Sequence, residues 1–246
     1  MAAVQIFLYY CRIAIHVAVA LAKILLYLRF WMVETRQREI RSWSTKALGL
    51  FGITLEIVGA RHPPPPLLLV ANHTSWLDIL VIQTHFDAVF VAKQDVRKWP
   101  AFGWLAERLG TVFVSRRQSQ EISSHVTTLT RKLASGVSVC IFPEGTTSDG
   151  ATVLPFKSAL LQPAIDSGIP VQPLAIRYEH PDGSRANEVA FVGEMSLVQS
   201  FNLLAGGKSI SACLQILPAI ANCISDATKS RGTGRNRNTC RNNIDR

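Results

Sequence analysis

His73 and Asp78, which are separated by four residues, are the two side chains of this chain best suited to acid–base chemistry. The apolar run at residues 67–71 predicts a buried strand, and residues 76–82 are apolar and compatible with a helix. We therefore expect His73 in the turn between them. There its ring can fold back and donate one nitrogen to the Asp78 carboxylate, which leaves the other nitrogen facing outward as the acceptor that a general base needs.

An isolated H-x4-D pattern is short and common, and its ordinary meaning is a helix cap followed by a solvated carboxylate. Thr74 or Ser75 can cap the new helix by accepting from its free amides. On one continuous ideal helix His73 and Asp78 would lie about 140° apart, too far for contact. The catalytic interpretation therefore depends on His73 preceding the helix and on the rest of the chain.

Three further blocks carry polar residues at the ends of predicted strands. They are residues 110–116 (GTVFVSR), 142–148 (FPEGTTS) and 170–176 (PVQPLAI). Loops at strand ends converge in α/β proteins while the strands stay rigid, so we expect these residues to gather near His73.

In this order the motifs resemble those of the glycerolipid acyltransferase family typified by 1-acylglycerol-3-phosphate acyltransferases. The resemblance covers about residues 67–177, through NH-x4-D, G-x-V-F-V-x-R, F-P-E-G-T and a V-x-P stretch, and residues 91–93 and 99–105 look like the family's linking stretch. It implies transfer of a fatty acyl group from acyl carrier protein or coenzyme A to a lysolipid hydroxyl. His73 would be the general base and Asp78 its orienter, with no acyl-enzyme, metal or cofactor beyond the acyl thioester.

The resemblance also implies which residues bind substrate. Arg116 would hold an anionic group of the acceptor, because a guanidinium fork suits phosphate or carboxylate. The alternative is a surface arginine after a strand. Glu144 and Gly145 would shape the acceptor site, and the alternative for Glu144 is an ordinary turn carboxylate. The full expected set is Asn72, Lys93, Gly110, Arg116, Glu144, Gly145, Thr146 and Lys157.

One position departs from the pattern of many phosphatidate-forming members, which place an arginine after F-P-E-G-T where this chain has Thr147. The longer string FPEGTTSDG, followed by LPFKSALL at residues 154–161, looks similar to the bacterial branch that acylates lyso-ornithine lipid. Arg116, Arg117 and Lys157 still offer cations. Lysophosphatidate, giving phosphatidate, is the first expectation for the acceptor, and lyso-ornithine lipid is the alternative.

Two other classes of function are less favoured. A thioesterase or lipid hydrolase would use water as the acceptor, and no G-x-S-x-G elbow is present. A lipid-binding protein without turnover would not need His73 and Asp78.

Composition favours a membrane enzyme. The chain has 246 residues, is 48% hydrophobic and has a net charge of +9, and its mean hydropathy is +0.19. The positive charge is concentrated at residues 1–48 and 229–246, which suits an anionic membrane surface. Nucleic-acid binding is less favoured, because these arginines lie in an anchor and a tail and not on a face interleaved with aromatic residues.

The first 33 residues are largely apolar and are interrupted by Gln5, Arg12, His16 and Lys23. On a helix these four fall within about 40° of one another. One narrow polar stripe favours a helix that lies in the membrane interface, or that packs its stripe on protein, over a simple spanning anchor. Residues 13–33 could still span if Lys23 snorkels, and a cleaved signal peptide is a weaker alternative. The arginines that follow mean that any spanning topology would place the catalytic domain on the cytoplasmic side of the cell membrane, where the acyl donors are.

Alternating patterns predict an α/β fold, a mixed sheet covered by helices and preceded by an N-terminal membrane-associated helical segment. Residues 1–62 are predicted to be a membrane-anchoring helical region, 63–228 the α/β acyltransferase domain and 229–246 a basic disordered tail, with the prolines at 63–66 as the first boundary. The five cysteines are odd in number and widely spaced, which indicates a reducing compartment. Predicted strands are 67–71, 88–92, 111–115, 138–142 and 171–176, with weaker ones at 188–193 and 211–217; predicted helices are 75–84, 99–109, 118–135, 158–167 and 196–204.

Overall fold

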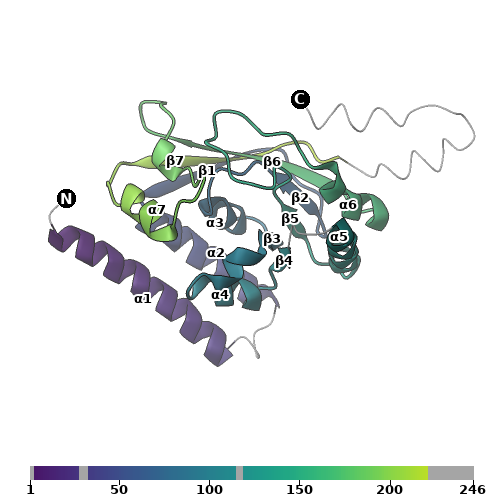
Figure 1. The fold of residues 1–246 in the computed structure, drawn as a ribbon, viewed down its shortest axis with the longest axis horizontal. Coiled ribbons are helices and arrows are strands. Elements are labelled where there is room, and N and C mark those ends of the chain that lie inside the picture. Colours follow the sequence, from purple (N-terminus) through teal and green to yellow (C-terminus); the bar gives the residue numbers. More distant parts are fainter. Residues whose placement is uncertain (1–2, 28–32, 115–118, 221–246) are drawn as a thin grey trace, which may run out of the picture.

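The computed structural model describes residues 3–27, 33–114 and 119–220, which form a seven-stranded sheet with helices on both faces (Figure 1). The pair β6–β7 is antiparallel and the other neighbours are parallel, so the predicted mixed α/β sheet is confirmed. In spatial order the strands are β1 (Ile53–Gly59), β7 (Ile210–Ile216), β6 (Val171–Glu179), β2 (Leu68–Ala71), β5 (Val139–Ile141), β3 (Val89–Lys93) and β4 (Val112–Val114).

The central strand β2 is buried on both faces, which explains its continuous apolar run. Alternate side chains point to opposite sides. Leu69 and Ala71 join one hydrophobic cluster, and Leu68 and Val70 join a second one with Leu129 of α5.

Helices cover the two faces unequally. Helices α5 (Ser119–Ala134) and α6 (Gln162–Ser167) pack on the face of the second cluster, while α3 (Leu77–Gln83) and α7 (Leu197–Leu204) pack on the first. Helix α4 (Phe102–Arg108) lies beyond α3, beside the 3-10 turn η1 (Gln94–Lys98). The remaining 3-10 turns are η2 (Ser158–Leu161) and η3 (Asn187–Val189).

Two sequence predictions need correction. The strand expected at 188–193 is a 3-10 turn and a loop, in which the Phe191 amide bonds to the Thr74 carbonyl and not to a neighbouring strand. The region 1–62, predicted to be helical, contains β1, which pairs in parallel with β7 from Ile53↔Ile210 to Gly59↔Ile216. The prolines therefore lie between two strands of one sheet.

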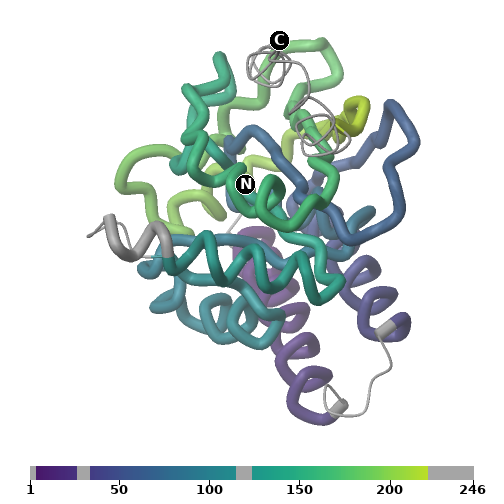
Figure 2. Tube along the Cα trace, turned by 90° about the vertical axis from the view of Figure 1, so that its right-hand side faces the viewer, coloured from purple at the N-terminus to yellow at the C-terminus, as the bar shows by residue number. Residues whose placement is uncertain are grey.

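The N-terminal segment forms two helices, α1 (Ala3–Tyr27) and α2 (Val33–Leu50), which lie side by side and project from the sheet (Figure 2). Two members of the polar stripe of α1, His16 and Lys23, contact α2, while Gln5 and Arg12 are exposed. Lys23 Nζ lies 2.6 Å from Glu39 Oε2, and the His16 ring stacks on Trp43 with 4.9 Å between centroids. The opposite face of α1 exposes large apolar side chains. Among the described residues α1 is the one helix long and apolar enough to cross a membrane.

Candidate active site

His73 lies in the turn between β2 and α3, and Asp78 lies in the first turn of α3. His73 Nδ1 is 2.8 Å from Asp78 Oδ2, so the predicted contact is present. An ionised carboxylate can only accept, so Nδ1 carries the proton and Nε2 is left as the acceptor. The His73 side chain is 19% exposed and that of Asp78 is fully buried.

The Asp78 carboxylate is held by four donors. Besides His73, Oδ2 accepts from the backbone N–H groups of Thr74 at 2.8 Å and Ser75 at 2.9 Å. Oδ1 accepts from the Tyr178 hydroxyl at 2.7 Å. This set satisfies the buried charge and fixes the orientation of the His73 ring. Ser75 Oγ accepts from the Leu77 amide at 3.3 Å, but the N-cap position is occupied by Trp76 and not by Thr74 or Ser75 as predicted.

Sequence reasoning missed Tyr178, which follows the V-x-P stretch on β6. Burial, followed by the nearby Asp78 charge, raises the pKa of Tyr178 well above its usual value, so its hydroxyl remains a donor. One signal could have identified it. Alternation along β6 puts Leu174, Ile176 and Tyr178 on the same face, all buried in the cluster that α3 covers.

The F-P-E-G-T loop holds the His73 turn from the side of β5. The ring stacks on Phe142 with centroids 3.9 Å apart. The His73 amide donates to Glu144 Oε1 at 2.7 Å, and its carbonyl accepts from the Ser148 amide at 2.8 Å. Within the described part of the chain, no hydrogen bond is made to His73 Nε2.

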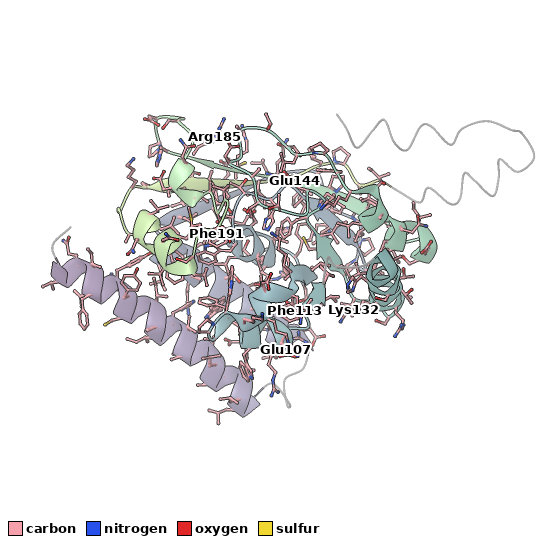
Figure 3. The ribbon with its side chains drawn as sticks, viewed as in Figure 1. Glu107, Phe113, Lys132, Glu144, Arg185 and Phe191 are labelled. Carbon is pink, nitrogen blue, oxygen red and sulfur yellow. The ribbon has the colours of Figure 1, made fainter. Side chains whose placement is uncertain are left out.

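Glu144 braces two segments at once. Its second oxygen accepts from the Leu154 amide at 2.8 Å, and the residue is 4% exposed, near the centre of Figure 3. Gly145 next to it has φ 70°, and a Cβ there would lie 2.7 Å from Lys157 Nζ. The glycine therefore allows Lys157 to lie across the loop.

Asn72 continues the sheet beyond the end of β2. Its side-chain amide donates to the Ile176 carbonyl at 3.0 Å, and its oxygen accepts from the Ile176 amide at 2.7 Å. These bonds replace one rung of the ladder with β6. Its expected role in substrate binding stays a prediction.

The structure brings most of the predicted residues together at the carboxyl edge of the sheet. His73, Asp78, Asn72, Glu144, Gly145, Thr146 and Lys157 lie on the loops after β2 and β5 or in the first turn of α3. Lys93 ends β3 on the same edge, two strands from β2, or about 10 Å.

Gly110 is not part of this group, because it precedes β4 and lies at the amino end of a strand parallel to β3. Arg116 and Arg117 fall outside the described residues. Thr147, the position at which the sequence departs from the expected motif, donates its hydroxyl hydrogen to the carbonyl of Phe191, to the left of Glu144 in Figure 3. Among the described residues, no group of three or more His, Cys, Asp or Glu side chains could hold a metal ion.

Residues 54–177 match the family described as "Acyltransferase". The chain belongs to this acyltransferase family. Among curated relatives it is 45% identical over 146 residues to a lyso-ornithine lipid O-acyltransferase of Rhizobium meliloti, a match that covers 56% of this chain and 50% of that protein. It is 33% identical over 199 residues to a 1-acyl-sn-glycerol-3-phosphate acyltransferase of Neisseria gonorrhoeae, covering 80% and 75% of the two chains.

The fold has a counterpart among solved structures. The 1-acyl-sn-glycerophosphate acyltransferase PlsC from Thermotoga maritima matches with a TM-score of 0.62 and 22% identity, over 89% of this chain and 84% of that one. This likeness concerns the fold. The chain spans half the length of the R. meliloti relative, and the names of its relatives divide between two acceptors.

Proposed function

We propose that this protein transfers a fatty acyl group from a thioester, on acyl carrier protein or coenzyme A, to a hydroxyl of a lysolipid. The observation that carries the proposal is the 2.8 Å contact between His73 Nδ1 and Asp78 Oδ2. It leaves Nε2 of a partly exposed ring as a proton acceptor beside the loop held by Glu144.

In this reaction His73 Nε2 takes the proton of the lysolipid hydroxyl while the oxygen attacks the thioester carbonyl carbon. The tetrahedral intermediate then breaks the carbon–sulfur bond, and the thiol leaves with the proton from His73. Asp78 holds the ring and stabilises the imidazolium that forms between the two steps. The products are the acylated lipid and the free thiol of the donor.

Direct transfer is favoured over an acyl-enzyme. Ser75 is fully buried, and its Oγ accepts from the Leu77 amide. Cys140 is also fully buried, and burial, followed by the Asp78 charge, raises the pKa of its thiol well above the usual value. A protonated, inaccessible thiol is a poor nucleophile.

The test is an acyl-transfer assay on the detergent-solubilised chain with a radiolabelled acyl donor. His73→Ala should lower turnover by at least about 10²-fold, the scale of general-base catalysis, and should leave membrane association unchanged. Near-normal turnover by this variant would contradict general-base catalysis by His73. Release of free fatty acid at the same rate without an acceptor would instead indicate a thioesterase.

For the acceptor we propose lyso-ornithine lipid. Thr147 supports it, because its hydroxyl is tied to the Phe191 carbonyl and brings no cation to the loop. The 45% identity to the R. meliloti relative named for that acceptor also supports it. Sequence motifs alone put lysophosphatidate first, and the N. gonorrhoeae relative named for 1-acyl-sn-glycerol-3-phosphate keeps it as the second candidate. Parallel assays with both acceptors decide between them.

We also propose that α1 attaches the enzyme to the cytoplasmic surface of the cell membrane. His16 and Lys23 of its polar stripe contact α2, while Phe7 and Leu25 are 67% and 71% exposed on its outer side. An amphipathic helix of this kind buries its apolar face at the boundary between head groups and acyl chains.

A further inference from the structure

A cavity of about 360 Å³ opens next to the turn that carries His73. It lies on the side of this turn that faces β6, whereas Phe142 lies on the side of β5. Its walls come from three segments: the turn after β2, the loop at residues 149–151, and the end of β6 with the loop that follows it. Its polar and charged lining residues are Thr74, Asp149, Arg177, Tyr178, Glu179 and Arg185.

Two walls of this cavity also hold the catalytic carboxylate. The Thr74 amide and the Tyr178 hydroxyl both donate to Asp78. A third wall touches the first, because a Cβ on Gly150 would lie 3.3 Å from the Thr74 side chain. Thr74 follows His73 directly, so the cavity is lined by the residue next to the proposed general base.

The charged groups of the cavity are balanced, with two arginines and two carboxylates. Arg177 and Glu179 form a loose pair at 3.5 Å. Arg185, labelled on the loop after β6 in Figure 3, makes no ion pair within the described residues. Asp149 uses Oδ1 to accept from the Ala151 amide at 2.8 Å, and no described cation pairs with its carboxylate.

This balance suits a zwitterion better than a phosphate. A phosphomonoester carries a charge of about −1.5 to −2 near pH 7, so its site needs an excess of cations. A head group with one carboxylate and one ammonium needs one group of each sign. The planar fork of Arg185 can bind a carboxylate in a bidentate manner, and a carboxylate such as Asp149 can accept from an ammonium.

We propose that this cavity binds the amino acid head group of the acceptor, with Arg185 holding its free carboxylate and Asp149 its free ammonium. The inference rests on the proposed function, namely acyl transfer to lyso-ornithine lipid. It assigns acceptor specificity to residues outside the four sequence motifs, on the opposite side of the catalytic turn from Lys93.

The experiment compares Arg185→Gln and Asp149→Asn with the unchanged full-length enzyme, in detergent, with lyso-ornithine lipid and lysophosphatidate as acceptors. Each substitution should raise the KM for lyso-ornithine lipid about tenfold, the loss of one charge-assisted hydrogen bond. The kcat, the KM for the acyl donor and turnover of lysophosphatidate should stay within about twofold of the unchanged enzyme. Arg131→Gln, an exposed arginine on α5 across the sheet, is the matched control.

A modified acceptor tests the assigned contact directly. The methyl ester of lyso-ornithine lipid lacks the carboxylate, so its KM with the unchanged enzyme should be raised about as much as the KM of lyso-ornithine lipid with Arg185→Gln. Arg185→Gln should raise the KM of the methyl ester no further. Additive losses would overturn the assignment of Arg185.

The remaining outcomes separate this inference from the proposed function. If the unchanged enzyme acylates lyso-ornithine lipid but both cavity variants behave like Arg131→Gln, the head-group site is wrong and the proposed function stands. Equal losses with both acceptors would also overturn the site, because they would reflect a disturbed catalytic turn. If only lysophosphatidate is acylated, the proposed acceptor and this inference fail together.

Discussion

The chemistry of the site depends on one carboxylate that is out of contact with water. Asp78 is fully buried, and each of its oxygens has a donor. A buried carboxylate without such donors would become protonated or would destabilise the fold. The four donors therefore satisfy both oxygens of Asp78 and hold the carboxylate that contacts His73 Nδ1 in one orientation.

Tyr178→Phe should show how much the fourth donor contributes. The variant leaves Asp78 Oδ1 buried without a partner, which costs about 1–3 kcal/mol in the free energy of unfolding. We expect kcat to fall with little change in the KM of either substrate, because Tyr178 acts on Asp78 and not on substrate. Urea unfolding and steady-state kinetics measure the two effects. A change confined to KM would contradict this positioning role.

The raised pKa of Tyr178 determines the pH range in which its hydrogen bond to Asp78 stabilises the fold. The usual tyrosine pKa is 10.0, and burial and Asp78 raise it well above that value. The protonated hydroxyl therefore contributes its full stability below pH 10 and loses it only as the pH rises through the higher folded-state value. We expect the alkaline limb of the kcat profile below pH 10 to be the same in the unchanged enzyme and in Tyr178→Phe. A limb that disappears in the variant would show that Tyr178 titrates within this range.

Substitutions of Glu144 can distinguish a role in holding the two loops in place from a role in direct binding of the acceptor. Its two oxygens accept from the amides of His73 and Leu154, so Glu144→Ala leaves both amides without their partner, at about 1–3 kcal/mol each. Glu144→Gln keeps one acceptor and should lose about half as much stability. Urea unfolding of the two variants checks this order. Equal, small effects on stability with a large increase in the acceptor's KM would instead favour a direct contact with substrate.

At the scale of helices and strands, the sequence predicted features that depend on neighbouring residues but not contacts between residues far apart in the chain. The five strands predicted between residues 67 and 176 are present, because each is a short apolar run bounded by turn residues. The contact between His73 and Asp78 was predictable since the two residues lie five apart in one turn. The Tyr178 bond to Asp78 joins residues 100 apart; alternation along β6 predicts that Tyr178 faces the buried cluster but not that it bonds to Asp78.

The two faces of α1 predict different effects of substitution. Phe7→Glu combined with Leu25→Glu changes only the exposed face of α1. Burial of each of these apolar side chains in a membrane would contribute about 1.5–3 kcal/mol to the free energy of binding. We expect flotation with anionic vesicles to fall by at least about tenfold, while acyl transfer in detergent is retained. Ile165→Glu on α6, an exposed apolar residue on the opposite face of the sheet, is the control. Unchanged flotation of the double variant would contradict attachment through α1.

For the whole molecule, the main difference from the sequence prediction is where the sheet domain begins. Strand β1 lies at one edge of the sheet, and its partner β7 comes from the other end of the described chain. The stretch ITLEIVG alternates only partly, and it precedes four prolines that indicated a boundary. A pairing between residues such as Ile53 and Ile210, more than 150 positions apart, is visible only in the folded structure.

Two truncations test this boundary. A chain that begins at residue 63 lacks β1 and the buried residues Leu48 and Phe51, so it exposes the edge of β7 and the cluster beneath it. We expect it to show no cooperative urea transition by circular dichroism, because an uncovered edge and an open core are incompatible with a stable fold.

A chain that begins at residue 33 keeps α2 and β1 and loses α1, whose buried residues are few. It should unfold cooperatively at a lower urea concentration than the full chain and should no longer float with vesicles. Cooperative unfolding of the shorter chain would mean that the sheet is stable without β1 and that the prolines do mark the domain boundary.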